Sequence, residues 1–183
     1  MLGSIPFGVI LTRMFGAGDL RQIGSGNIGA TNVLRTGRKG LAAGTLLLDI
    51  AKGSLAVFLA GLVSNDLAIL AGVGAFLGHL YPIWLRFNGG KGVATMLGVV
   101  LALHWMIGLI YAFVWVLALA VSRISSVSGI AAAVSAPIAF LVLGWTYAAV
   151  VCGAMATLLV WKHRENMQRI VAGVEPRIGK KSA

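Results

Sequence analysis

Five long apolar runs, almost free of charged side chains, restrict what this sequence can fold into. They lie at about residues 1–15, 41–63, 67–85, 93–121 and 128–161. Only 11% of the 183 residues are charged while 58% are hydrophobic, so a soluble domain could not cover its core with polar surface. A helix of about 20 apolar residues crosses a bilayer. The sequence therefore predicts an all-α, polytopic integral membrane protein, one domain over 1–183 with a basic C-terminal tail at 174–183. We expect this tail to be frayed from Glu175 onward.

The number of spans depends on the last two runs, which are too long for one straight span each. Both contain an interruption near the middle, at His104–Trp105 and at Gly144–Trp145. Tilt would absorb part of the excess length and leave five spans, whereas two tight hairpins give seven. We favour seven short transmembrane helices, with five as the alternative.

Basic residues indicate the orientation. Fourteen of the 15 Lys and Arg fall in four places that alternate with the spans: 13–40, 86–92, 122–127 and the tail from Lys162. Cytoplasmic loops of membrane proteins carry such an excess. The N-terminus is therefore expected outside and the C-terminus on the cytoplasmic side of the membrane. A five-span chain would move only Arg123 outside.

The net charge of +10 is thus explained by orientation, and the protein is not expected to bind nucleic acid. Most of its aromatic side chains lie inside the apolar runs, where they cannot stack on bases. The single cysteine, Cys152, is also in such a run. No disulfide and no metal site based on cysteine is expected.

One base lies inside an apolar run. Lys52 follows Asp49 by three residues, which puts the two side chains on one helix face. A charge at the bilayer centre costs about 2.5–3.5 kcal/mol on insertion scales, so such residues pair or face a polar cavity. The spacing predicts an internal ion pair with a structural role, and direct contact with a site is the alternative.

The segment GSGNIGATNVLR, residues 24–35, is the first of three polar segments on the predicted cytoplasmic side. Glycines such as Gly26 allow backbone amides to approach an anion closely. Four polar side chains can add hydrogen bonds: Ser25, Asn27, Thr31 and Asn32. Arg35 offers a planar fork suited to phosphate oxygens. The alternative is that the glycines only permit tight turns or close helix contacts.

The second segment is GHLYPIWLRFNGGKGVAT, residues 78–95. Its glycine loop, formed by Gly89, Gly90 and Gly92 around Lys91, opens a helix whose N-terminus attracts anions. It is no Walker A motif, because Gly92 stands where Ser or Thr would follow the lysine. In the alternative reading Lys91 marks only topology. For His79 a structural role is at least as well supported as a catalytic one.

The third segment is WKHREN, residues 161–166. Helical spacing puts His163 and Asn166 on one face, while Arg164 and Glu165 point elsewhere. Together the three segments predict one cytoplasmic pocket with backbone amides, two cations and a possible base, His163. No cluster of metal ligands, cofactor motif or nucleophile–base set is evident, so direct transfer between two bound anions is expected.

These segments, with GSIPFG at 3–8, LLLDIAKG at 46–53 and KHRENMQRIVAGVEPRIG at 162–179, resemble the bacterial acyl-phosphate:glycerol-3-phosphate acyltransferase family. The resemblance runs in order over nearly the whole chain. It implies seven transmembrane helices and transfer of a fatty acyl group from acyl phosphate to the 1-hydroxyl of glycerol 3-phosphate. The products would be lysophosphatidic acid and phosphate, in the first step of membrane phospholipid synthesis, carried out by a monomer in membrane lipid.

The same resemblance implies roles for individual residues. It associates Ser25, Thr31 and Arg35 with substrate contacts, and the glycine loop with glycerol 3-phosphate. It makes His163 and Asn166 a functional pair and gives Glu165 a structural role. Ser128 matches a polar position at the inner end of the sixth helix and joins the site only with seven spans. A transporter or anion channel using the same basic pocket is the alternative function.

Overall fold

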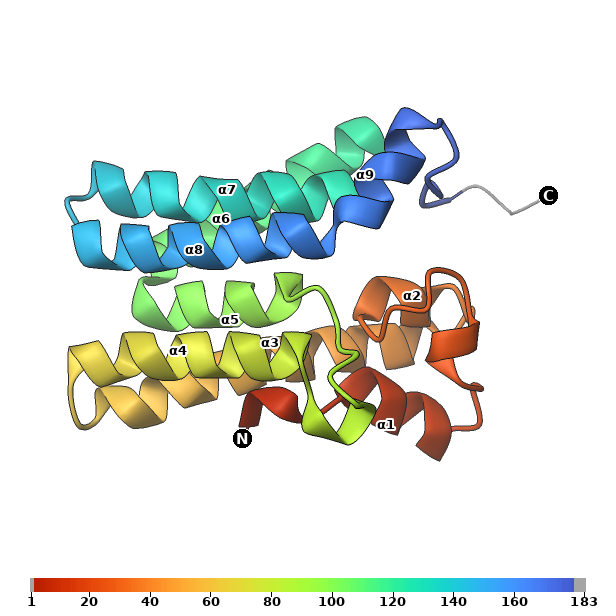
Figure 1. The fold of residues 1–183 in the computed structure, drawn as a ribbon, viewed down its shortest axis with the longest axis horizontal. Coiled ribbons are helices and arrows are strands. Elements are labelled where there is room, and N and C mark those ends of the chain that lie inside the picture. Colours follow the sequence, from red (N-terminus) through yellow and green to blue (C-terminus); the bar gives the residue numbers. More distant parts are fainter. Residues whose placement is uncertain (1, 180–183) are drawn as a thin grey trace. The chain divides into compact units, whose positions relative to one another are not determined.

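A computed structural model describes residues 2–179 of the chain, and every regular element within them is a helix. The all-α prediction is confirmed. The chain divides into two compact units, Met1–Leu103 and His104–Ala183. Each unit is a compact assembly of helices (Figure 1).

Unit 1 is built around the long helix α3, which contacts α1, α2, α4 and α5. Its α-helices are α1 (Phe7–Met14), α2 (Ala30–Leu34), α3 (Lys39–Gly61), α4 (Asn65–Leu80) and α5 (Val93–Leu103). The unit also has three single turns of 3-10 helix: η1 (Leu2–Ser4) before α1, η2 (Leu20–Gln22) between α1 and α2, and η3 (Ile83–Leu85) between α4 and α5.

Small residues let α3 and α5 approach closely. A Cβ atom on Gly53 would overlap the backbone carbonyl of Thr95, and one on Gly98 would overlap that of Ile50. The Ser54 hydroxyl donates a 2.8 Å hydrogen bond to the carbonyl of Gly98. Small side chains at a crossing and hydroxyl groups that bond across it are the usual means of joining helices in membranes.

Unit 2 contains α6 (Trp105–Ser122), α7 (Ser125–Val142), α8 (Thr146–Lys162) and α9 (Arg164–Val171). Helix α7 packs against both α6 and α8 (Figure 1). The turn into α7 uses Arg123 in a left-handed conformation. The turn out of α7 uses Gly144, whose φ of 77° suits glycine because it lacks Cβ.

The two interruptions predicted in the long apolar runs are helix boundaries. Helix α5 ends at Leu103 and α6 begins at Trp105, while α7 ends at Val142 and α8 begins at Thr146. Within residues 2–179, four segments are long and apolar enough to cross a membrane: Lys39–Gly61, Asn65–Leu85, Trp105–Ser122 and Ser125–Val142. Val93–Leu103 and Thr146–Lys162 are shorter apolar helices. The count of seven spans and the orientation of the termini stay predictions.

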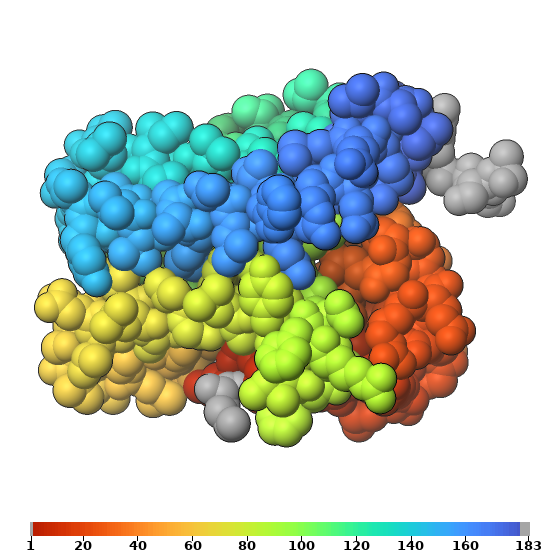
Figure 2. All heavy atoms as spheres, in the orientation of Figure 1, coloured from red at the N-terminus to blue at the C-terminus, as the bar shows by residue number. Residues whose placement is uncertain are grey.

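Large apolar side chains cover much of the outer surface of the helices, of which Figure 2 shows one face. On α6, Phe113 and Val121 are 65% and 80% exposed. A patch this apolar would be a liability in water, whereas lipid chains are a suitable neighbour for it. The exposed surface therefore agrees with a membrane protein.

The end of the described chain is more ordered than the sequence led us to expect. Residues from Glu175 onward were predicted to form a frayed basic tail, but the Glu175 carboxylate is bound by three side chains of unit 2. The amide of Ile178 also donates a 2.8 Å hydrogen bond to the carbonyl of Arg123. These bonds fix residues 175–178, so the expectation of fraying is wrong there; residues 180–183 lie outside the described residues.

Candidate active site

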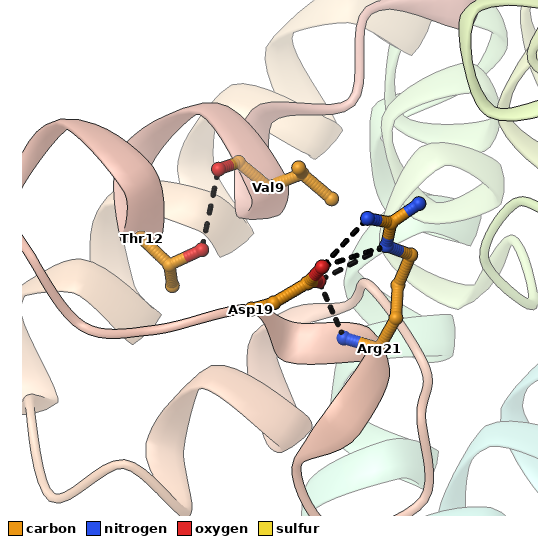
Figure 3. A network of polar contacts seen from close by, with 4 residues as sticks. All are labelled: Val9, Thr12, Asp19 and Arg21. Atoms are coloured by element: carbon orange, nitrogen blue, oxygen red, sulfur yellow. Dashed lines mark hydrogen bonds and ion pairs between the residues drawn. The ribbon is translucent and has the colours of Figure 1, made fainter.

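An ion pair between Asp19 and Arg21 stabilises the loop that precedes the first polar segment. Asp19 caps η2 and holds the side chain of Arg21 with both carboxylate oxygens, at 2.6 Å from Nη2 and 3.0 Å from Nε (Figure 3). The side-chain hydrogen bond from Arg21 lowers the pKa of Asp19 to about 2. On α1, Thr12 donates a hydrogen bond to the carbonyl of Val9, also drawn in Figure 3.

Asn32 holds this segment in shape. Its amide group donates to the carbonyls of Leu20 and Ile23, at 3.0 and 2.9 Å, and its Oδ1 accepts from the amide of Ser25 at 3.3 Å. Its side chain is buried and forms contacts with the protein backbone. Predicted as a substrate contact, Asn32 thus has the geometry of a residue that shapes the loop around Ser25.

The absence of a side chain at Gly24 leaves room for the side chain of Arg35. Its φ is 55°, and a Cβ atom there would lie 2.8 Å from Nη1 of Arg35 and 2.5 Å from Oδ1 of Asn32. The guanidinium therefore packs over the glycine backbone at an exposed position on the surface. This contact holds a cation against Gly24, the residue before Ser25, and a phosphate-binding segment requires such a cation.

The glycine loop between η3 and α5 is pinned to the end of α4. The amide of Gly89 donates to the carbonyl of Leu80 at 3.2 Å, and that of Gly90 to the carbonyl of His79 at 3.0 Å. Both amides therefore serve the loop itself rather than facing an anion. Anion binding here is then expected from Lys91 and from the N-terminus of α5, which carries partial positive charge.

The predicted ion pair is present on α3. Lys52 Nζ lies 2.7 Å from Asp49 Oδ1, and both side chains are almost completely buried. Their spacing of three residues produces this contact within one helix, as the sequence indicated.

His163 stands at the junction between α8 and α9 and is only 3% exposed. Its Nδ1 lies 2.9 Å from the carbonyl oxygen of Leu159. Because a carbonyl can only accept, Nδ1 carries a proton, and in the neutral ring Nε2 is the basic nitrogen. A fixed tautomer of this kind suits a histidine that accepts a proton.

Asn166 is held by a carboxylate that sequence reasoning overlooked. Its Nδ2 donates to Glu175 Oε1 at 2.6 Å, and the hydroxyl of Ser126 donates to the same oxygen at 2.8 Å. Arg169 Nε donates to the other oxygen at 2.7 Å. Burial raises the pKa of Glu175, but these three hydrogen bonds outweigh it and lower the pKa overall. The sequence offered one signal for this role, because Glu175 is an acidic residue within the basic tail at 174–183.

Two other predicted residues have different surroundings from those expected. Glu165, expected to be structural, has a side chain that is 66% exposed and only a loose 3.9 Å ion pair with Arg164. The buried carboxylate network belongs to Glu175 instead. Ser128, expected to contact substrate, is fully buried and donates a 3.0 Å hydrogen bond to the carbonyl of Ile124 within its own helix.

The predicted site residues are divided between the two units. The first segment and the glycine loop belong to unit 1, while the third segment and Ser128 belong to unit 2. A single pocket formed by both groups stays a prediction. Among the described residues, no group of three or more His, Cys, Asp and Glu could hold a metal ion.

Apolar helices that carry basic, glycine-containing loops define the class of polytopic helical membrane proteins with a candidate phosphate-ester site. The particular family follows from comparison with known proteins. The model of the glycerol-3-phosphate acyltransferase family matches residues 1–173, and the chain belongs to this family.

Relatives extend this match over the whole chain. A glycerol-3-phosphate acyltransferase of Mesorhizobium japonicum is 55% identical over 99% of this chain and 93% of its own length. One from a Jannaschia species is 55% identical over 100% of this chain and 90% of its own. The crystal structure of PlsY, an integral membrane glycerol 3-phosphate acyltransferase, in its glycerol 3-phosphate form has a TM-score of 0.93 at 36% identity, covering 97% of this chain and 90% of that one. Its lysophosphatidic acid form has a TM-score of 0.90.

Proposed function

We propose that the protein transfers a fatty acyl group from acyl phosphate to the 1-hydroxyl of glycerol 3-phosphate, at the cytoplasmic face of a bacterial inner membrane. The observation that carries the proposal is the full-length likeness to the crystal structure of PlsY in its glycerol 3-phosphate form. Acyl phosphate as the donor rests on the resemblance of the three polar segments to the acyl-phosphate-dependent family.

The chemistry needs no covalent intermediate on the protein. An acyl phosphate is a mixed anhydride with a good leaving group. The 1-hydroxyl oxygen attacks the acyl carbon and forms an ester bond, and the bond from that carbon to the phosphate oxygen breaks. Phosphate leaves with the electron pair, and the hydroxyl proton goes either to His163 or to the departing phosphate.

The protein's task is then to hold two anions close together against their repulsion and to orient the hydroxyl. Arg35 and Lys91 supply positive charge for the two phosphate groups. His163, with Nδ1 bonded to a carbonyl, presents Nε2 as the nitrogen that can take the proton. Asn166, fixed by Glu175, is placed one helical turn along on the same face as His163 and is assigned to substrate orientation.

The test is a two-substrate assay on purified protein in detergent. Lysophosphatidic acid and phosphate should form in equal amounts from acyl phosphate and glycerol 3-phosphate, and EDTA should leave the rate unchanged. Product from acyl-CoA alone would refute the proposed donor. Phosphate-ester flux into liposomes without transferase activity would favour a transporter instead.

A histidine variant tests the proton's route. If His163 is the base, His163→Ala should lower kcat by about 100-fold to 10,000-fold and remove the wild-type pH dependence of kcat. If the phosphate takes the proton, the pH profile should keep its shape while KM rises. A variant with wild-type kcat and KM would exclude His163 from both roles.

A further inference from the structure

A buried polar cluster in unit 1 joins two membrane helices and is not used by the chemistry described above. It consists of Asp49 and Lys52 on α3 and His79 on α4, which are 2%, 3% and 4% exposed. Lys52 Nζ lies 2.7 Å from Asp49 Oδ1, 2.8 Å from His79 Nδ1 and 3.0 Å from the carbonyl oxygen of Ile5. Side chains of this kind are costly inside a membrane helix and generally serve function.

Lys52 is paired with Asp49 and is therefore taken as an ammonium, which assigns the tautomer of His79. An ammonium group has three N–H donors and no acceptor, and the three atoms around Lys52 Nζ are all able to accept. The Nδ1 atom of His79 therefore accepts a hydrogen bond, so the proton of the neutral ring is on Nε2. Lys52 in this way fixes both the protonation and the rotation of the imidazole.

The other edge of the ring faces the glycine loop. A Cβ atom on Gly90 would overlap Nε2 of His79 and lie 2.7 Å from Cε1. The carbonyl of His79 also accepts the hydrogen bond from the amide of Gly90. His79 thus supports Gly90 through its ring and its backbone, and the next residue along the chain is Lys91.

A role in helix packing alone does not account for this arrangement. The Asp49–Lys52 pair lies within one helix, and its pairing needs neither His79 nor close contact between an imidazole and a glycine. Lys52 instead connects α3 to His79, and the ring of His79 leaves room at position 90 only for glycine. The cluster therefore ends at the loop that bears the predicted phosphate-binding lysine.

We propose that His79 is a positioning residue for the glycine loop, held in one tautomer and orientation by Lys52 and Asp49, and that it sets the place of Lys91 for the phosphate of glycerol 3-phosphate. This inference rests on the proposed function. It predicts that the cluster affects the affinity for glycerol 3-phosphate and not the rate of the chemical step.

Steady-state kinetics with each substrate varied separately test the proposal. Lys52→Met keeps the length of the side chain but loses its charge, so His79 is no longer oriented. Displacing one partner of a charged contact weakens binding, so KM for glycerol 3-phosphate should rise by about 10-fold to 100-fold. The kcat and the KM for acyl phosphate should stay within about 3-fold. Equal changes in all three constants would show a merely structural role and overturn the proposal.

A double-mutant cycle tests the contact between the ring and the loop. Gly90→Ala should raise KM for glycerol 3-phosphate, because its Cβ displaces the ring of His79. In a chain that also carries His79→Asn, the shorter side chain leaves room, so the added effect of Gly90→Ala should be at least about 5-fold smaller; contacting residues couple in this way. Independent effects that multiply would refute the contact. Gly74→Ala is the matched control on α4, since nothing lies within 4 Å of its Cβ.

Folding is checked by thermal unfolding of each variant in detergent, and the cycle still decides the question if Lys52→Met does not fold. A failure of the proposed function would be recognised by a different result from a failure of this inference. If the wild type makes no lysophosphatidic acid, that function is refuted. Calorimetric binding of glycerol 3-phosphate to the wild type and the Gly90 and His79 variants then still tests the coupling.

Discussion

Replacing Glu175 by alanine should destabilise the protein by about 2–4 kcal/mol. The change removes the acceptor for two buried donors, Asn166 Nδ2 and Ser126 Oγ, and each buried donor left without a partner costs about 1–3 kcal/mol. Arg169 also loses its partner, but its side chain is 33% exposed and water can solvate it, so this adds less than about 1 kcal/mol. Water can enter the vacated space and solvate the two donors in part. The expected loss of stability therefore stays in the lower part of the about 2–6 kcal/mol that two unpaired donors would cost.

Thermal unfolding in detergent at pH 7, followed by tryptophan fluorescence, measures this effect. For a chain of this length, about 2–4 °C of melting temperature corresponds to 1 kcal/mol, so a decrease of about 5–15 °C is expected. Glu165→Ala is the matched control, because this neighbouring acid is largely exposed and should change stability by no more than about 0.5 kcal/mol. Equal melting temperatures for the two variants would refute the network.

The pH dependence gives an independent check on Glu175. Since its pKa is below the ordinary value of 4.5 in the folded protein, the unfolded state binds the proton more readily. The stabilisation is therefore fully present above pH 4.5 and is lost as the pH falls through the folded pKa. The gap in melting temperature between wild type and Glu175→Gln, which cannot ionise, should narrow below about pH 4.5. A gap that is constant with pH would contradict the assignment.

Three further perturbations test the site and the topology. Lys91→Ala should lower kcat/KM by about 30-fold or more, because removing a buried charge partner costs about 2–5 kcal/mol; near-wild-type activity in folded protein would refute the phosphate-binding role of this loop. Gly24→Ala adds a Cβ 2.8 Å from Nη1 of Arg35 at a φ of 55°, so its kinetics should resemble those of Arg35→Ala, and unchanged kinetics would refute that contact. In a chain whose native cysteine is replaced, a cysteine at Asn65 should react with an impermeant thiol reagent from outside, whereas one at Arg123 should not; labelling at Arg123 would exclude seven spans.

Several features of the site depend on contacts between residues distant in sequence. The partner of Lys52 on its own helix was predictable, but its bond to His79 joins residues 27 positions apart. Glu175 is 49 residues from Ser126, and its place in a basic tail suggested mobility rather than a buried network. The amides of Gly89 and Gly90 were expected to face an anion, yet they close a turn onto the end of α4.

The sequence by itself determined the helical class, the interruptions at His104 and Gly144, and the ion pair between Asp49 and Lys52. All of these depend on hydropathy and on spacing within one helix, which a few neighbouring residues set. Only the tertiary structure decided which side chains the buried polar groups meet, and hence that Glu175 rather than Glu165 holds the third segment. Burial makes a partner necessary for each such group, but the partner is chosen by how the helices pack, which no local pattern records.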